Sequence, residues 1–170
     1  EAVRYVYEAG LMQGTTGTTF SPGRTSNRGQ IAAILHRLEG SPRAGTPPFT
    51  DVAADSYCAD AVAWAEKNGI VRGFEDGTFR PEGRITRQQL AAILFRYLEH
   101  RGADTAGRAD LSRFSDTAAV ADYAREAMAW AVSAGLLQGR SDGTLDPAGS
   151  ATRAQTAVIL QRLGALREEA

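Results

Sequence analysis

One sequence block occurs three times in the chain, and this repetition constrains the fold more than any other feature. The block Gly73–Pro81, "GFEDGTFRP", returns 66 residues later at Gly139–Pro147, and a looser copy lies 59 residues earlier at Gly14–Pro22. A period of this size is typical of repeat proteins, in which each unit buries its apolar face against its neighbours. We therefore expect three similar units packed on one another.

Two polar linkers, residues 40–48 and 100–113, absorb the difference between the two periods and mark the unit boundaries. Repeats two and three also share an opening, Phe49–Val52 and Phe114–Thr117, that repeat one lacks. We expect repeat one to be truncated at its start, as in a fragment of a longer protein. The expected units are repeat one at 1–48, repeat two at 49–113 and repeat three at 114–170.

Each unit is predicted to be a helix, a loop and a second helix. In the second helix of repeat two, Leu90, Ile93, Leu94, Tyr97 and Leu98 follow the spacing of a buried stripe. No unit of this size buries such a face alone, so we expect a mainly α fold around a shared apolar centre. Helices are expected at 27–40, 60–69, 86–100, 122–135 and 152–164.

Composition excludes several classes of function. The chain has 43% hydrophobic residues, enough for a core, and 19 Lys and Arg against 20 Asp and Glu, so no global field attracts nucleic acid or a membrane. No apolar run is long enough to span a bilayer, and the start at Glu1 does not resemble a signal peptide. The one cysteine, Cys58, excludes an intrachain disulfide and a cysteine zinc site, and is expected to be a packing residue.

No residue pattern predicts catalysis. The two histidines, His36 and His100, lie late in second helices, and the chain has no G-x-S-x-G nucleophile elbow. The acidic residues are scattered or recur with the repeats, so the sequence predicts a non-enzyme that needs no cofactor. A calcium loop around Gly77 is disfavoured because Arg72 and Phe74 would take the positions of oxygen ligands.

An arginine opens the second helix of every repeat, at Arg28, Arg87 and Arg153. Each follows a capping residue, and Thr86 with Gln89 forms a full capping box. A cation is disfavoured there, because the helix N-terminus already carries partial positive charge. Three repetitions of this misfit require a reason.

Two reasons remain open. Each guanidinium can brace the interface by binding a loop carbonyl or a carboxylate of the neighbouring repeat, and the candidates for that carboxylate are Asp51, Asp76, Asp116 and Asp142. Alternatively, the arginine and the free N–H groups of the helix end form a receptor for a ligand carboxylate, since the guanidinium fork matches that group bidentately. The Asp-Gly turns at Asp76–Thr78 and Asp142–Thr144 precede two of these arginines and are usually structural.

With these motifs in register, the whole chain resembles an S-layer homology domain with three repeats. The resemblance rests on the motifs F-x-D-V at Phe49–Val52, G-x-x-x-G-T-F-x-P at Gly73–Pro81 and I-T-R-x-Q at Ile85–Gln89, with weaker copies at Phe114–Thr117, Gly139–Pro147 and Ala151–Gln155. It implies a pseudo-threefold assembly with short extended segments and with ligand grooves between adjacent repeats.

The resemblance also implies the ligand, a secondary cell-wall polysaccharide that commonly bears a pyruvyl ketal, and a location at the bacterial cell surface. A protein–protein or self-assembly module of a surface protein is the alternative. Tyrosines stand where the family usually carries a sugar-stacking tryptophan, and we rank the sites of repeat two first, then three, then one. The expected ligand-binding residues are Arg28, Arg87, Arg153, Tyr57, Tyr123, Asp76, Gly77, Thr78, Asp142, Gly143 and Thr144.

Overall fold

The computed structural model describes residues 1–168, and over that range the fold is mainly α, as predicted. The last two expected helices differ at their ends: the fourth begins with a short 3-10 turn, and the fifth continues past residue 164. The elements are α1 Ala2–Glu8, α2 Arg28–Leu38, α3 Ala59–Lys67, α4 Arg87–His100, α5 Arg125–Ser133 and α6 Arg153–Glu168, with 3-10 turns η1 Thr117–Ala119 and η2 Asp122–Ala124.

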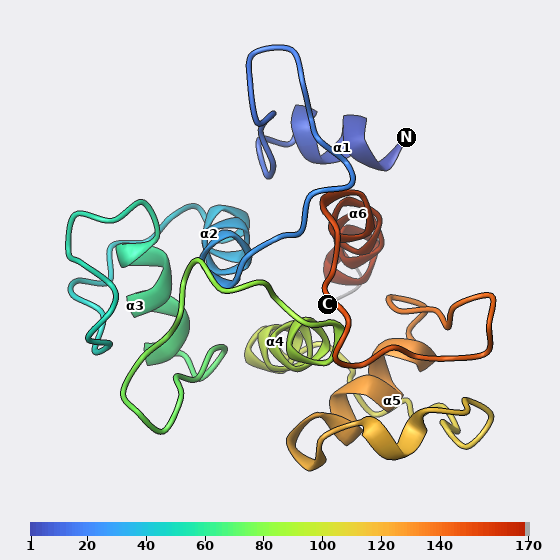
Figure 1. Cartoon of the computed structure of the whole chain (residues 1–170). Coiled ribbons are helices and arrows are strands. Elements are labelled where there is room, and N and C mark those ends of the chain that lie inside the picture. The colour runs from blue at the N-terminus through green and yellow to red at the C-terminus, as the bar shows by residue number, and fades with distance from the viewer. Residues whose placement is uncertain (169–170) are drawn as a thin grey trace.

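The helices form three lobes around a pseudo-threefold axis (Figure 1). The second helices of the repeats, α2, α4 and α6, stand near the axis, and α1, α3 and α5 lie outside them. The extensively packed pairs are α1 with α6, α3 with α2, and α5 with α4. Each lobe therefore joins the first helix of one repeat to the second helix of the preceding repeat, and the α1–α6 pair closes the ring.

Short extended segments before the second helices pair around the axis. Ser26 N–H donates to Ala151 O at 2.9 Å, Ala151 N–H donates to Ile85 O at 3.1 Å, and Ile85 N–H donates to Ser26 O at 3.0 Å. These three residues occupy the same position in the three repeats, and all are buried. The cycle satisfies backbone groups that a buried axis would otherwise leave unpaired.

At the other end of the central helices, one carboxylate joins all three repeats. Glu39, just after α2, accepts from Tyr97 Oη at 2.5 Å, from Arg101 Nη1 at 2.9 Å and from Arg167 Nη2 at 3.1 Å. Burial alone would raise the pKa of Glu39, but the hydrogen bonds from Tyr97 and Arg101 and the nearby arginine charges outweigh it and lower that pKa.

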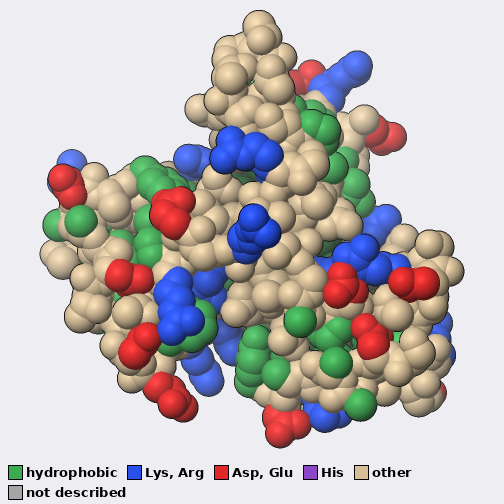
Figure 2. All heavy atoms as spheres, viewed as in Figure 1, with side chains coloured by type: hydrophobic (Ala, Val, Ile, Leu, Met, Phe, Trp, Pro, Cys, Tyr) green, Lys and Arg blue, Asp and Glu red, His purple; other side chains and the backbone are tan. Residues whose placement is uncertain are grey.

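The core residues expected from the sequence are buried. Trp64 and Trp130 are 6% and 2% exposed, and Cys58 is fully buried, so these three residues pack as predicted. No helix within residues 1–168 combines the length and apolarity needed to cross a membrane. On the face seen in Figure 2, acidic and basic side chains are interspersed, in keeping with the net charge of −1.

Candidate ligand grooves between the repeats

Each repeated arginine reaches into the neighbouring repeat. The Nε of each arginine donates to the carbonyl of the residue two positions before the proline that ends the repeated block. The Nη2 of the same side chain donates to a backbone carbonyl just after the outer helix. The acceptors are Phe79 O at 2.8 Å and Arg72 O at 2.9 Å for Arg28, Leu145 O at 2.8 Å and Gln138 O at 2.7 Å for Arg87, and Phe20 O at 2.9 Å and Gln13 O at 2.5 Å for Arg153.

These contacts make the arginines inter-repeat braces. Arg28, Arg87 and Arg153 are 6%, 5% and 7% exposed, and burial lowers the pKa of each guanidinium. Among the described residues no acceptor binds their Nη1 atoms, and these atoms are not among the buried unpaired ones. One nitrogen of each fork therefore stays open to solvent, so bracing does not exclude ligand binding.

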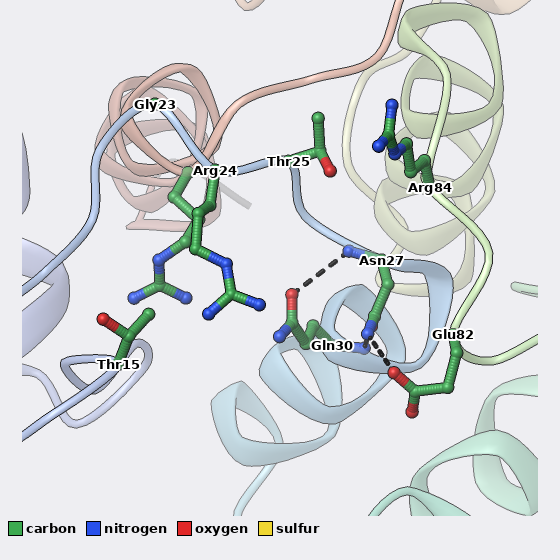
Figure 3. A pocket seen from close by; sticks show the side chains of 9 residues that line it. Thr15, Gly23, Arg24, Thr25, Asn27, Gln30, Glu82 and Arg84 are labelled. Atoms are coloured by element: carbon green, nitrogen blue, oxygen red, sulfur yellow. Dashed lines mark hydrogen bonds between the residues drawn. The ribbon is translucent and has the colours of Figure 1, made fainter.

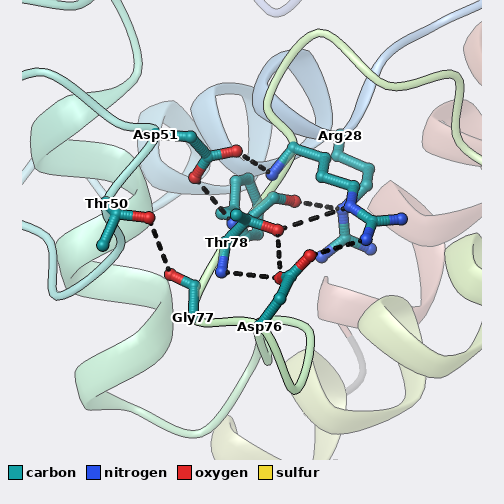
Figure 4. A network of polar contacts seen from close by, with 8 residues as sticks. Arg28, Thr50, Asp51, Asp76, Gly77 and Thr78 are labelled. Atoms are coloured by element: carbon teal, nitrogen blue, oxygen red, sulfur yellow. Dashed lines mark hydrogen bonds and ion pairs between the residues drawn. The ribbon is translucent and has the colours of Figure 1, made fainter.

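The aspartates of the F-x-D opening hold the loops that the arginines bind. Asp51 accepts from Phe79 N–H at 2.8 Å and from Arg80 N–H at 2.7 Å, and so fixes the turn whose Phe79 carbonyl binds Arg28. Asp51 comes from a segment before α3 and reaches the loop that carries Thr78 (Figure 4). The sequence left a loop carbonyl and a carboxylate as possible partners of the arginine, and the structure shows the carbonyl. The carboxylate does not bind the arginine but holds the turn that carries this carbonyl.

The two Asp-Gly-Thr turns lie outside the grooves described below. Asp76 accepts from the Thr78 N–H at 3.0 Å and hydroxyl at 2.6 Å, and the φ of Gly77 is +77°. Hydrogen bonds from Thr78 and then Arg80 lower the pKa of Asp76 to about 2. In repeat three the corresponding residues form the same turn, with Asp142 accepting from Thr144, and with Gly143 at a φ of +80°.

Three grooves lie beside the arginines, and each combines parts of different repeats. The motif loop and second helix of one repeat form the walls, and the preceding repeat supplies the arginine. Tyrosine, where present, comes from the following repeat. We name them groove A (Gln30, Arg37, Tyr57, Arg153), groove B (Arg28, Arg72, Gln89, Arg96, Tyr123) and groove C (Arg87, Arg140, Gln155, Arg162).

Groove B is the largest of the three, with a volume of about 600 Å³. Arg28, Arg72 and Arg96 line it together with one carboxylate, Glu75. Burial and then the charge of Arg72 lower the pKa of Arg96, which makes no hydrogen bond within the described chain. Tyr123 is 56% exposed at this groove, and burial raises the pKa of its hydroxyl. The result is a cationic cleft with an open aromatic ring.

Grooves A and C are smaller, at about 210 and 470 Å³. Tyr57 lines groove A with 58% exposure, and its hydroxyl donates to Asn27 Oδ1 at 3.1 Å. No tyrosine of the described residues lines groove C. The structure thus places Arg28 and Tyr123 in one groove and Arg153 and Tyr57 in another. The groove of Arg87 has no tyrosine among the described residues.

Ranking the sites by the completeness of each repeat assumed that an arginine serves its own repeat. Instead Arg87, from the most complete repeat, faces groove C, and the groove of repeat two receives Arg28 from repeat one. The sequence analysis also missed a second groove arginine, which lies nine residues after the first in every repeat. It is Arg37, Arg96 or Arg162, and its threefold recurrence in the sequence was the available signal.

A separate polar pocket of about 560 Å³ opens near the N-terminus of α2. Asn27 completes its capping box with Gln30 and donates to Glu82 at 2.8 Å, while Arg24 and Arg84 lie at other edges (Figure 3). Asn27, Gln30 and Glu82 pair with one another, whereas no hydrogen bond within residues 1–168 engages the side chain of Arg24 or Arg84. Within residues 1–168, no cluster of three His, Cys, Asp or Glu side chains is placed to hold a metal ion.

Known proteins with similar sequences share this repeat. The S-layer homology domain model matches residues 1–32, 48–91 and 113–157. The chain is 33% identical over 165 residues to the surface-layer 125 kDa protein of Lysinibacillus sphaericus, covering 95% of the chain and 14% of that protein. It is 32% identical over 155 residues to an amylopullulanase of Thermoanaerobacterium thermosulfurigenes, covering 90% of the chain and 8% of the enzyme.

A cellulosome-anchoring protein of Acetivibrio thermocellus is 25% identical over 159 residues, covering 91% of the chain and 35% of that protein. The chain therefore spans only a small part of each of these relatives. Family matches at three successive segments agree with the three repeats and with the shortened first repeat. The chain belongs to the S-layer homology family, with three tandem repeats of which the first is truncated.

Proposed function

We propose that the chain is a non-catalytic module that anchors a larger protein to the bacterial cell surface by binding an acidic cell-wall polysaccharide. Its relatives include a surface-layer protein, a cellulosome-anchoring protein and enzymes in which the matched part is a small fraction of the length. Groove B supports an acidic ligand, because its lining contains three arginines and an exposed tyrosine but only one carboxylate among the described residues, Glu75.

The proposed ligand sugar carries a carboxylate, as a pyruvyl ketal does. Its carboxylate would accept from the open Nη1 of Arg28 and from Arg96, since a guanidinium donor to a carboxylate forms a strong, directional hydrogen bond. The Tyr123 ring would pack on the apolar face of the sugar. Groove A offers the same pair with Arg153 and Tyr57 in less space, so we propose groove B as the main site and groove A as the secondary one.

The experiment measures binding of the whole chain to purified cell-wall polysaccharide before and after mild acid removal of pyruvyl ketals. Binding should fall at least about tenfold after this treatment, the scale of one lost charge-assisted hydrogen bond. Unchanged binding after treatment would exclude the pyruvyl carboxylate as the recognised group. Attachment to envelope proteins free of polysaccharide, or self-association alone, would favour the protein–protein alternative instead.

The site is tested with matched variants. Arg96→Gln removes a cation from groove B, and Arg162→Gln removes the equivalent cation from groove C, where no tyrosine of the described residues lies. Arg96→Gln should weaken binding about tenfold, because it removes a cation that no backbone carbonyl engages. Arg162→Gln should change ligand binding little. It also removes the hydrogen bond from Arg162 Nη1 to Gly135 O at 2.9 Å, which lies within the protein. An equal loss in both variants would exclude groove B as the main site.

A further inference from the structure

The polar pocket near the N-terminus of α2 contains two arginines that the grooves do not use. We name it the Arg24–Arg84 pocket, and its lining includes Arg24, Thr25, Gln30, Glu82, Arg84 and Arg153. Its volume of about 560 Å³ lies within the range of about 300–1,000 Å³ that is usual for small-molecule sites. Arg24 and Arg84 are exposed, and Figure 3 shows them on opposite sides of Thr25. Within residues 1–168 no hydrogen bond engages either guanidinium group, so both face the pocket without a protein partner.

These two arginines do not belong to the repeated pattern. At the equivalent positions the other repeats carry glycine in place of Arg24 and a small hydroxyl residue in place of Arg84. These counterparts are Gly83 and Gly149 for the first position, and Thr25 and Ser150 for the second. The bracing arginines, by contrast, occur in every repeat. The packing of the repeats therefore does not require Arg24 or Arg84, and their presence needs another reason.

The pocket has an excess of positive charge. Its lining contains three arginines, one from each repeat, and a single carboxylate among the described residues, Glu82. Glu82 accepts from Asn27 Nδ2 at 2.8 Å and forms no ion pair within residues 1–168. Burial and then the charge of Arg24 lower the pKa of Arg153, so two like charges lie near each other. An anion placed beside them would relieve this repulsion.

The end of α2 is not itself the receptor, because its first backbone donors are already bound. The N–H of Arg28 donates to Gly83 O at 3.0 Å, and that of Gly29 donates to Pro81 O at 2.8 Å. The Asn27 side chain caps the next N–H at 2.7 Å. An anion in the pocket would therefore bind to guanidinium groups, whose donors match the oxygens of carboxylates and phosphates.

We propose that the Arg24–Arg84 pocket binds an oxyanion group, a carboxylate or a phosphate, through the guanidinium groups of Arg24 and Arg84. The pocket adjoins groove A, because Gln30 and Arg153 line both. A polymer that continues past groove A enters this pocket, so the oxyanion is either a second acidic substituent of that polymer or a free ion. Only the polymer as its source rests on the proposed function, whereas the anion site does not.

The first arm of the test titrates the whole chain with inorganic phosphate at constant ionic strength, since salt screens exposed charges. The NMR signals of the Arg24 and Arg84 guanidinium groups should shift saturably at millimolar phosphate, and chloride should shift them little. Arg24→Gln and Arg84→Gln should each weaken phosphate binding about fivefold, the scale of one strong exposed ion pair. Arg43→Gln is the matched control, because it removes an exposed cation from the linker 40–48, outside the pocket, and should leave phosphate binding unchanged.

A variant with increased affinity separates binding from folding. Glu82→Gln removes the carboxylate of the pocket, and its amide oxygen still accepts from the Asn27 side chain. This variant should bind phosphate about two- to fivefold more tightly, because a like charge no longer opposes the anion. A substitution that only damaged the fold would not raise the affinity, so weaker binding by Glu82→Gln would count against the site.

The second arm identifies the source of the oxyanion by measuring polysaccharide binding in the Arg96→Gln background, where groove B is weakened. If the polymer supplies the group, adding Arg24→Gln should weaken polymer binding about fivefold, and adding Arg43→Gln should not. Phosphate binding beside unchanged polymer binding would assign the site to a free anion.

The proposal is overturned if phosphate shifts the two guanidinium signals no more than chloride does. It is also overturned if Arg24→Gln, Arg84→Gln and Arg43→Gln bind phosphate alike. These phosphate measurements do not involve the polysaccharide, so polymer binding that ignores the removal of pyruvyl ketals would weaken the proposed function and leave the anion site standing.

Discussion

At the residue scale, the buried arginines brace neighbouring repeats, and we propose that the same side chains also bind the ligand. Two nitrogens of each guanidinium hold the neighbouring repeat, and no acceptor within the described residues binds the third. Arginine suits this position because its planar fork presents several donors at fixed angles, which a lysine ammonium does not. The unfavourable place at a helix N-terminus is offset by the carbonyl contacts, so the electrostatic misfit in the sequence has a structural cause.

Arg28 and Arg87 form a matched pair that separates bracing from binding, because both donate to two carbonyls but only Arg28 faces a groove with a tyrosine. Arg28→Ala and Arg87→Ala should each lower stability by about 2–3 kcal/mol, the scale of lost hydrogen bonds to a charged group and buried acceptors left unpaired. Only Arg28→Ala should also weaken polysaccharide binding, by about tenfold or more.

Calorimetric titration and thermal unfolding of the same preparations check this prediction. Arg28→Lys keeps the charge and should recover part of the binding but little of the stability. Equal losses of binding in the two alanine variants, beside equal losses of stability, would mean that the arginines act only as braces.

At the element scale, the three central helices meet at a carboxylate rather than at an apolar contact. Glu39 binds groups from α4 and α6, the other two central helices, and it has no acidic counterpart in the other repeats, where Leu98 and Gly164 stand in register. The ring is thus asymmetric at the C-terminal ends of the central helices, where Glu39 lies. It is nearly symmetric at their N-terminal ends, where the cycle of three backbone hydrogen bonds lies.

The Glu39 cluster makes stability dependent on acid pH. Because the pKa of Glu39 is lower in the folded chain than in the unfolded chain, its contribution is present above the unfolded value of about 4.3 and is lost as pH falls through the folded value. Glu39→Gln should therefore be less stable than the parent at pH 7, and the difference should shrink below about pH 4. Denaturant unfolding from pH 7 to pH 3 measures it, and a constant difference would contradict it.

At the scale of the whole molecule, the repeat in the sequence and the lobe in space are different units. Each lobe pairs helices from two repeats, and α1 on α6 joins the two ends of the chain. A single repeat excised from the ring would lose the partner of its outer helix and that of its central helix. Cooperativity should therefore extend over the whole ring.

We expect the chain to unfold in one transition, with the calorimetric enthalpy equal to the van't Hoff enthalpy. Residues 49–113 alone, which contain α3 and α4 but neither α2 nor α5, should show little stable helix by circular dichroism. As a control, residues 28–67 keep the α2–α3 pair and should be more helical per residue. Independent folding of the single repeat would contradict the closed-ring view.

Much of this protein was determined by local sequence. The threefold period, the helical stripes, the capping boxes and the Asp-Gly turns depend on neighbouring residues, so the helices α2 to α6 and the positive φ of Gly77 and Gly143 were predictable. Which repeat each arginine contacts was not, because Arg28 and Phe79 lie 51 residues apart and only the closed ring brings them together. Pairing of grooves with tyrosines, and the Glu39 cluster, likewise depend on how the second helices meet around the axis. Periodicity is a property of local backbone and side-chain packing, whereas the choice of partner is settled only when all three repeats bury their apolar faces at once.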